Sequence, residues 1–249
     1  MSLSATTARH WLERWDRQQE GYLPDRETIF AVIADAVQAT TVSRPDPLVL
    51  DLGCGPGSLG ARIKERLPRA RVIGVDSDPV LLAIAAAAYD IEFVDHDLAD
   101  PGWVDALPVA GPFDAVVSTT ALHWLELEAL TEVYAQAGER MRPGGILLNG
   151  DKMPGADQRI TDLQRELVQR QIARAGVAEA ENWEDWWVAI KKEPALAEPI
   201  AERDRRTWAH PARSNPDYAA HLEALAAAGF GSVGTVWQYG PRRILAAIK

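Results

Sequence analysis

Residues 48–57 read Leu-Val-Leu-Asp-Leu-Gly-Cys-Gly-Pro-Gly, an apolar run that passes into a glycine-rich turn. An apolar run of this length is typical of a buried parallel strand. Gly53, Gly55 and Gly57 allow the backbone to turn sharply and to approach a ligand closely, because no Cβ blocks the way. Apolar residues at helical spacing follow, so free N–H groups at that helix start face a crevice at the carboxyl end of the sheet. The stretch therefore predicts a cofactor site.

The glycine-rich turn could hold either a dinucleotide such as NAD or S-adenosylmethionine. Gly55, Gly57 and Gly60 satisfy the G-x-G-x-x-G spacing of dinucleotide folds, and Asp76 follows at the distance of a ribose-binding acid. Asp51, however, directly precedes the glycines, and no Arg or Lys lies between it and Gly60. A pyrophosphate would therefore meet an acid without positive partners. A ligand with a cationic centre or amino group, and a carboxylate for the helix start, fits better, which favours S-adenosylmethionine over NAD.

Five segments in this order resemble the class I S-adenosylmethionine-dependent methyltransferases. They are Asp51-Leu-Gly-Cys-Gly-Pro-Gly, Val72-Ile-Gly-Val-Asp-Ser-Asp, Phe93-Val-Asp-His-Asp-Leu, Phe113-Asp-Ala-Val-Val-Ser and Met141-Arg-Pro-Gly-Gly-Ile-Leu-Leu. The resemblance covers residues 45–150 continuously and resumes near 215–249. It is greatest to the small-molecule branch, which includes trans-aconitate and quinone-biosynthesis methyltransferases. Because fold does not carry substrate identity, the acceptor stays open.

The resemblance implies a set of cofactor contacts at the strand ends. In that family the acid at the end of the second strand, here Asp76, holds the ribose hydroxyls. Asp97 would accept a hydrogen bond from the adenine amine, and Leu98 would offer a backbone N–H. Asp51 suits the methionyl amine, although it could instead cap the following helix. The implied cofactor-binding residues are Asp51, Gly53, Gly55, Gly57, Asp76, Ser77, Asp97, Leu98 and Thr119.

Neighbouring acids compete for two of these roles. Asp78 precedes a proline and is the better helix cap, which leaves Asp76 for the ribose. Asp95 and Asp100 are the rivals of Asp97, which the spacing of the family favours. The thiol of the single cysteine has no histidine or other base nearby in sequence, so we expect it to pack and not to react.

His123 is the candidate catalytic residue. It follows the fourth predicted strand, where the family places residues beside the transferring methyl group. A neutral imidazole there could take a proton from a hydroxyl, carboxylic acid or amine of the acceptor. The alternative is that His123 lines the pocket or bonds a backbone carbonyl. Tyr22, Trp124 and Trp187 are the predicted substrate-binding residues, with packing as the alternative for each tryptophan.

Two further clusters have open interpretations. Trp183, Trp186 and Trp187 could form an apolar wall for the substrate, but a helix presents one face to a cleft, so we expect at least two in a core. A run of basic residues could bind a carboxylate of the substrate, with surface solvation as the alternative. These basic residues are Arg203, Arg205, Arg206 and Arg213.

Strands and helices alternate along most of the chain. Strands are predicted at 48–52, 71–75, 91–94, 113–118, 145–149, 233–239 and 242–248, and helices at 57–67, 79–88, 126–140 and 216–228. This alternation is typical of the α/β class, with a doubly wound, mostly parallel, Rossmann-like sheet of seven strands. The last two strands, joined at Gly240-Pro241, are expected to form an antiparallel hairpin.

Two helical regions lie outside this alternation. Thr6 or Thr7 can cap a first helix, and Asp25 a second. Later in the chain, helices are predicted at 157–175 and from Asn182 to near Pro194, with four of the nine tryptophans in their neighbourhood, Trp208 included.

The predicted division of the chain has three parts. Residues 1–42 form an N-terminal helical lid over the cofactor. Residues 43–150 and 214–249 form the Rossmann-like cofactor-binding domain. Residues 151–213 form an inserted helical cap over the carboxyl end of the sheet, where insertions of such folds carry substrate recognition.

Composition limits the partners of the protein. The chain has 249 residues, and 26 basic against 36 acidic side chains give a net charge of −10, which argues against broad binding to nucleic acids. With Cys54 as its one cysteine it can form no internal disulfide, and no apolar run approaches the roughly 20 residues of a membrane span. We expect a cytoplasmic monomer or homodimer that binds a small-molecule substrate, without nucleic acid, membrane or metal.

Three functions follow in decreasing order of preference. The first is S-adenosylmethionine-dependent transfer of a methyl group to O, N or C of a small organic acceptor. This chemistry depends mainly on positioning, so a weak catalytic pattern is what it predicts. The second is a regulatory protein that binds the cofactor without turnover. The third is an NAD-dependent oxidoreductase.

Overall fold

The computed structural model describes residues 3–176, 181–207 and 214–249. Seven strands in these residues form one sheet in the order β3-β2-β1-β4-β5-β7-β6. The strands are β1 (Leu48–Leu52), β2 (Arg71–Asp76), β3 (Glu92–Asp95), β4 (Phe113–Thr119), β5 (Met141–Lys152), β6 (Ser232–Tyr239) and β7 (Arg242–Ile248). β1 to β5 are parallel, and β7 runs antiparallel to β5 and β6. The predicted sheet and its antiparallel hairpin are confirmed.

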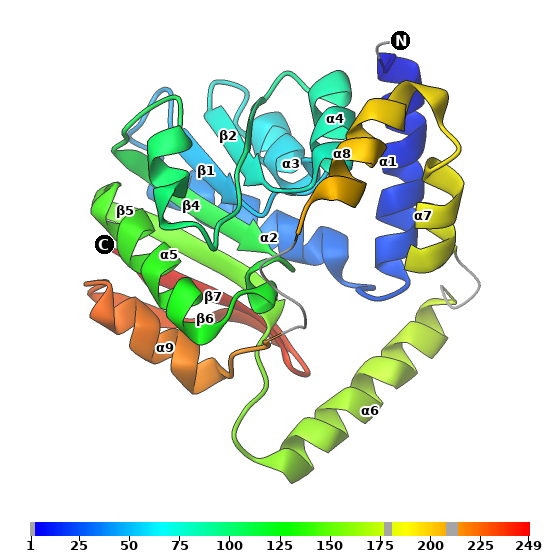
Figure 1. Cartoon of the computed structure of the whole chain (residues 1–249). Coiled ribbons are helices and arrows are strands. Elements are labelled where there is room, and N and C mark those ends of the chain that lie inside the picture. The colour runs from blue at the N-terminus through cyan, green and yellow to red at the C-terminus, as the bar shows by residue number, and fades with distance from the viewer. Residues whose placement is uncertain (1–2, 177–180, 208–213) are drawn as a thin grey trace.

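Helices cover both faces of this sheet (Figure 1). The helices are α1 (Ala5–Glu20), α2 (Arg26–Thr40), α3 (Ser58–Arg66), α4 (Pro79–Ala88), α5 (Leu127–Glu139), α6 (Gln158–Ala175), α7 (Trp183–Ile190), α8 (Ala197–Arg205) and α9 (Tyr218–Ala227). Short 3-10 helices are η1 (Pro101–Ala106), η2 (Leu122–Trp124) and η3 (Pro194–Leu196). α5 and α9 lie on one face of the sheet, and α2 and α3 on the other.

The alternation of side chains along β1 explains the two layers. Leu50 and Leu52 are buried in the cluster that contains Tyr134 of α5. Val49 points to the opposite face, into the cluster that contains Ile33 of α2. Successive side chains of a strand point to opposite faces, so a strand that is apolar at both phases needs a helical layer on each side.

A third cluster joins the N-terminal helix to the inserted region. Trp186 of α7 is fully buried, and its ring lies 5.9 Å from that of Trp11 and 4.9 Å from that of Trp15, both on α1. Edge-to-face pairs at such distances stabilise by about 1 kcal/mol beyond their burial. α7 packs against α1 and α8 packs against α4, whereas α6 extends away from the rest of the molecule (Figure 1).

Several predicted boundaries were wrong. The first helix is capped by Ser4, whose hydroxyl accepts a hydrogen bond from Thr7 N, and not by Thr6 or Thr7. β5 is much longer than the predicted strand 145–149, because it pairs with β4 and then with all of β7. α8 was not predicted at all. Trp208 and Arg213 lie outside the described residues.

Candidate functional site

The glycine-rich turn after β1 has the backbone that its sequence predicts. Gly53, Gly55 and Gly57 have φ angles of 66°, 53° and 82°, in the left-handed region. A Cβ on Gly53 would lie 2.3 Å from the Cβ of Ala121. The amides of Gly53 and Cys54 both donate to the carbonyl of Val75, at 2.8 and 3.0 Å, which ties the turn to β2. Only glycine fits the first of these positions.

Asp51 lies behind this turn. It is 1% exposed, and its Oδ2 accepts a hydrogen bond from Gly60 N of α3 at 3.1 Å. Burial raises the pKa of its carboxyl to about 7, against the effect of the Gly60 hydrogen bond. Asp51 and Gly57 are the two predicted cofactor residues that are not part of the cavity wall. The contact of Asp51 with Gly60 therefore fits the alternative that Asp51 caps the helix after the turn.

Asp76 faces the turn from the end of β2. Its Oδ2 accepts from Gly55 N at 2.8 Å, and its Oδ1 accepts from Asp78 N at 2.9 Å. Burial raises the pKa of Asp76 to about 6, and these backbone N–H groups oppose the rise. Asp78 caps α4 by accepting from Val80 N at 2.9 Å, so its predicted capping role is confirmed.

The end of β3 provides the next carboxylate. Asp97 and Leu98 both line the cavity, and Asp97 Oδ1 accepts from Ala99 N at 2.9 Å. The two rival acids have other partners. Asp95 is paired with Arg206 at 2.6 Å, and Asp100 caps η1 through Gly102 N. Neither rival is part of the cavity wall.

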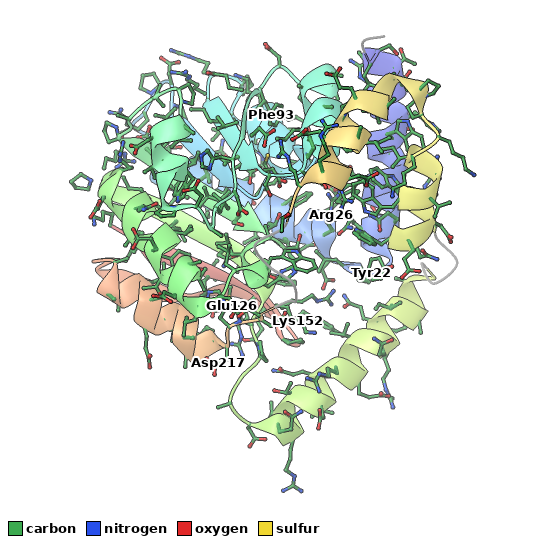
Figure 2. All side chains as sticks on the ribbon, viewed as in Figure 1. Tyr22, Arg26, Phe93, Glu126, Lys152 and Asp217 are labelled. Carbon is green, nitrogen blue, oxygen red and sulfur yellow. The ribbon has the colours of Figure 1, made fainter. Side chains whose placement is uncertain are left out.

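These strand ends open into one cavity of about 970 Å³. The predicted site residues that line it are Tyr22, Gly53, Gly55, Asp76, Ser77, Asp97, Leu98, Thr119, His123, Trp124 and Trp187. The opposite wall comes from α1, α2, α6 and α7. Figure 2 labels Tyr22 of the turn between α1 and α2, Arg26 of α2 and Lys152 of β5, which line this same cavity.

His123 pairs with an acid that the sequence did not single out. Its Nδ1 lies 2.8 Å from Asp151 Oδ1, and its backbone N–H donates to Asp151 Oδ2 at 3.1 Å. His123 follows β4 in η2, and Asp151 lies near the end of β5, so the parallel pairing of these strands brings the two together. Both residues line the cavity, and Asp151 is 4% exposed. A signal was available, since Asp151 follows the apolar run at the end of the fifth predicted strand.

Positive side chains also line this part of the cavity. Arg242, at the start of β7, is 6% exposed, and its Nε and Nη1 have no hydrogen-bond partner within residues 3–176, 181–207 and 214–249. Its Nη2 donates to Gln171 of α6 and pairs with Asp25 Oδ2 at 2.9 Å. Burial lowers the pKa of Arg242, and Asp25 opposes this. Arg26 of α2 pairs with Asp16 at 2.7 Å. Arg242 was not predicted as a site residue, because it begins the last predicted strand and belongs to none of the five motif segments.

The tryptophans of α7 divide between core and cavity. Trp186 is fully buried, and Trp187 is 7% exposed and reaches the cavity. Trp183 is largely exposed on the rim, where its backbone N–H donates to the hydroxyl of Tyr22 at 3.2 Å. The expectation that at least two of the three pack in a core is confirmed.

The basic run of α8 mainly fastens this helix to the strand ends. Arg203 Nε donates to Asp78 Oδ2 at 2.7 Å, and its guanidinium lies 3.9 Å from the ring centre of Trp187. Arg206 pairs with Asp95 and donates to Ser77 O at 2.6 Å. Arg205 pairs with Glu202 on the surface. Arg203 and Arg206 are therefore more than a solvated surface run, Arg205 fits surface solvation, and carboxylate binding by this run stays a prediction.

Two searches of the described residues add limits. No helix there is long and apolar enough to cross a membrane. No group of three or more His, Cys, Asp or Glu side chains in the same part of the chain is arranged to hold a metal ion.

Comparisons with known proteins agree with this site. A family model described as a methyltransferase domain matches residues 49–145. The trans-aconitate 2-methyltransferase of Streptomyces avermitilis is 32% identical over 233 residues, which cover 90% of this chain and 71% of that protein. Three other curated trans-aconitate 2-methyltransferases, including that of Deinococcus radiodurans at 35% identity over 113 residues, are matched over 40%, 36% and 60% of their own lengths.

Solved structures have the same fold at low identity. DesVI of Streptomyces venezuelae has a TM-score of 0.59 at 17% identity, with 95% of this chain and 97% of that chain covered. Magnesium protoporphyrin IX methyltransferase of Synechocystis PCC 6803, with bound S-adenosylhomocysteine, has a TM-score of 0.57 at 18% identity, with 96% and 94% covered.

Proposed function

Because the chain belongs to the class I S-adenosylmethionine-dependent methyltransferases, we propose that it transfers the methyl group of this cofactor to a small organic acceptor. The glycine-rich turn favours S-adenosylmethionine over NAD as the cofactor, and membership of this family agrees with S-adenosylmethionine. The acceptor, its methylated atom and the roles of single residues belong to the proposal.

One observation carries the proposal: the glycine turn, Asp76 and Asp97 lie along a single wall of one cavity. The residues that line the cavity fit the cofactor. Asp76 suits the ribose hydroxyls, and Asp97 and the Leu98 N–H suit the adenine. A cavity of about 970 Å³ is at the upper end of small-ligand sites, with room for a cofactor and a small acceptor.

The cofactor supplies an electrophilic methyl group on a sulfonium. The chain supplies position and exclusion of water, which in well-oriented reactions contribute roughly 7–11 kcal/mol of the barrier. We assign the N-terminal helices, residues 1–42, as a lid over the cofactor and residues 151–213 as a cap over the acceptor. Tyr22, Arg26 and Trp187 of these segments line the cavity, which supports that assignment.

We further propose that the acceptor has a carboxylate. Arg242 lines the cavity, and its Nε and Nη1 groups have no hydrogen-bond partner among the described residues, so a carboxylate of the acceptor would give one of these N–H groups a charge-assisted partner. Several curated relatives are named for trans-aconitate, a tricarboxylate. Replacing Arg242 by Leu is expected to raise the acceptor KM at least tenfold with little change in cofactor affinity.

We place the protein in the cytoplasm, as a monomer or homodimer that acts on small molecules without nucleic acid. Its single cysteine is buried, which agrees with that compartment. Size-exclusion chromatography with light scattering measures the oligomeric state.

Isothermal titration with S-adenosylmethionine tests the binding half of the proposal. Replacing Asp76 by Ala is expected to weaken binding by about 10–100-fold, because charge-assisted hydrogen bonds contribute about 1.5–3 kcal/mol. Asp105→Ala is the matched control, since Asp105 lies on the surface in η1, away from the cavity. Equal affinity in Asp76→Ala and the wild type would remove the ribose assignment.

Transfer of label from methyl-labelled S-adenosylmethionine into a small-molecule extract tests turnover. Tight cofactor binding without transfer to any pool would favour the regulatory alternative.

A further inference from the structure

The pairing of His123 with Asp151 is more specific than binding alone requires. The imidazole is largely buried, and Asp151 is 4% exposed and accepts both the backbone N–H of His123 and the N–H of Lys152. The carboxylate is thus fixed by two backbone groups before it meets the imidazole.

This arrangement sets the tautomer of His123. A carboxylate only accepts hydrogen bonds, so Nδ1 at 2.8 Å from Asp151 Oδ1 must carry the proton. In the neutral ring Nε2 then holds the lone pair. Among the described residues, Nε2 has no hydrogen-bond partner, and His123 lines the cavity. The ring is therefore oriented as a proton acceptor.

A proton acceptor is useful only to some acceptors of a methyl group. A carboxylate is already ionised near neutral pH and needs no base, whereas a hydroxyl or an ammonium group must lose a proton. Lys152, next to Asp151, and Arg242 also line the cavity, and Lys152 forms no ion pair within the described part of the chain. Arg242 is paired with Asp25, so Lys152 is the cation that disfavours an ammonium and stabilises a developing oxyanion.

We infer that the methylated atom is a hydroxyl oxygen of the acceptor, with His123 as the general base and Asp151 as its positioning residue. In the step, the acceptor O–H bond breaks and its proton goes to His123 Nε2. The oxygen forms a bond to the methyl carbon, and the carbon–sulfur bond breaks with its electron pair left on sulfur. This inference rests on the proposed function. It differs from carboxyl methylation, for which the pair would have no task.

Nitrogen-15 NMR of the histidine-labelled protein, loaded with S-adenosylhomocysteine, tests the pair without turnover. His123→Gln assigns the signals by their disappearance. We expect wild-type His123 in the Nδ1–H tautomer, and we expect Asp151→Asn to lose most of this preference. Asp157→Asn is the matched control, because it keeps a residue that caps α6 and lies outside the cavity. An Nε2–H tautomer in the wild type, or no change in Asp151→Asn, overturns the inference.

The methylated product tests the chemistry. Wild-type enzyme, methyl-labelled S-adenosylmethionine and a small-molecule extract are incubated, and the product is treated with mild alkali. A methyl ether keeps its label, whereas a methyl ester releases it as volatile methanol. Volatile label, or label on nitrogen or carbon, therefore overturns the inference.

The kinetics of a His123 variant test the role of the base. His123→Gln is expected to lower kcat by about 10²–10⁴-fold, with KM and cofactor affinity within threefold. His10→Gln on the exposed face of α1 is the control. Failure of the wild type to bind the cofactor or to transfer label contradicts the proposed function instead.

Discussion

Gly53 illustrates how closely one residue is constrained by two neighbouring strands. Its φ is 66°, and a Cβ there would meet the Cβ of Ala121 at 2.3 Å. Ala121 follows β4 and Gly53 follows β1, so this contact lies where two parallel strands end side by side.

Gly53→Ala is therefore expected to destabilise the protein by about 2 kcal/mol or more, because it combines backbone strain with overpacking. Cofactor binding should weaken as well, since the turn must shift. Urea denaturation followed by circular dichroism measures the change. Gly155→Ala is the control, because nothing lies within 4 Å of its added Cβ; equal losses in the two variants would contradict the argument.

Tyr134 joins two buried polar side chains. Its hydroxyl accepts from Asn149 Nδ2 at 2.9 Å and is hydrogen-bonded to His221 Nδ1 at 2.8 Å. Tyr134→Phe leaves both partners buried without this hydrogen bond, which is expected to lower the free energy of unfolding by about 1–3 kcal/mol. Tyr239→Phe removes a hydroxyl from the surface, where its contact with Arg174 is long at 3.4 Å, and should cost less than about 0.5 kcal/mol.

The cavity residues that belong to a sequence motif were predicted, whereas those that reach the cavity from strand positions outside the motifs were not. Asp76 and Asp97 follow strand ends at recognisable spacing, and both reach the cavity. Asp151 and Arg242 belong to β5 and β7, and their side chains meet the site only through the pairing of those strands. The place of Asp151 after the fifth predicted strand was a usable signal, but no local pattern specifies which residues strand pairing brings together, so Asp151 and Arg242 were both missed.

At the scale of elements, α6 is the least supported helix of the described chain. Thr161 is its one buried residue, and Ile160, Leu163 and Leu167 are largely exposed. Gln171 joins α6 to the body by contacting Asp25 and Arg242, and Arg174 adds a long hydrogen bond of 3.4 Å to the Tyr239 hydroxyl.

Gln171→Ala is expected to accelerate hydrogen exchange of α6 amides by about tenfold, which corresponds to a loss of about 1.4 kcal/mol for local opening. The melting temperature of the whole protein should hardly change. Gln158→Ala lies on the same helix and contacts Asp162 of that helix alone, so it should leave exchange of the remaining helix unaltered. Slower or unchanged exchange in Gln171→Ala would show that other contacts hold α6.

Helix α8, which was not predicted, shows a second limit of predicting helices from the spacing of apolar residues. Its sequence, Ala-Glu-Pro-Ile-Ala-Glu-Arg-Asp-Arg, has no apolar stripe, and none of its residues is buried. Ion pairs of Arg203 with Asp78 and of the adjoining Arg206 with Asp95 hold it against the strand ends. Periodicity of apolar residues predicted α4 and α5 because those helices bury a face, and it cannot detect a helix that is attached by charge.

For the whole molecule, buried acids and a buried histidine give opposite dependences of stability on pH. Folding raises the pKa of Asp51 from 3.8 to about 7. Between these values the folded state binds more protons than the unfolded state, so this contribution is full below about pH 4 and is lost as the pH rises through 7. Burial lowers the pKa of His221 below 6.5, so its contribution is present above 6.5 and is lost as the pH falls.

Comparing the free energy of unfolding of the wild type with that of Asp51→Asn separates the contribution of the Asp51 carboxyl from those of the other titrating groups. The variant should gain stability relative to wild type as the pH rises from about 4 to 7, since it has no carboxyl to ionise there. Denaturation at a series of pH values, without cofactor, measures the two curves. Parallel curves would mean that Asp51 titrates alike in the folded and unfolded states.

The position of β7 determines the order in which the protein can be completed. This strand lies between β5 and β6 in space, yet it follows both in the chain. During synthesis, the edge of β5 stays without its second neighbour until residues 242–248 leave the ribosome. Under the proposed function, most residues that would hold the methyl donor lie between Gly53 and Leu98, far before Arg242 in the chain. A nascent polypeptide would then have made most of its contacts for the methyl donor well before Arg242, the residue proposed to bind the acceptor, leaves the ribosome.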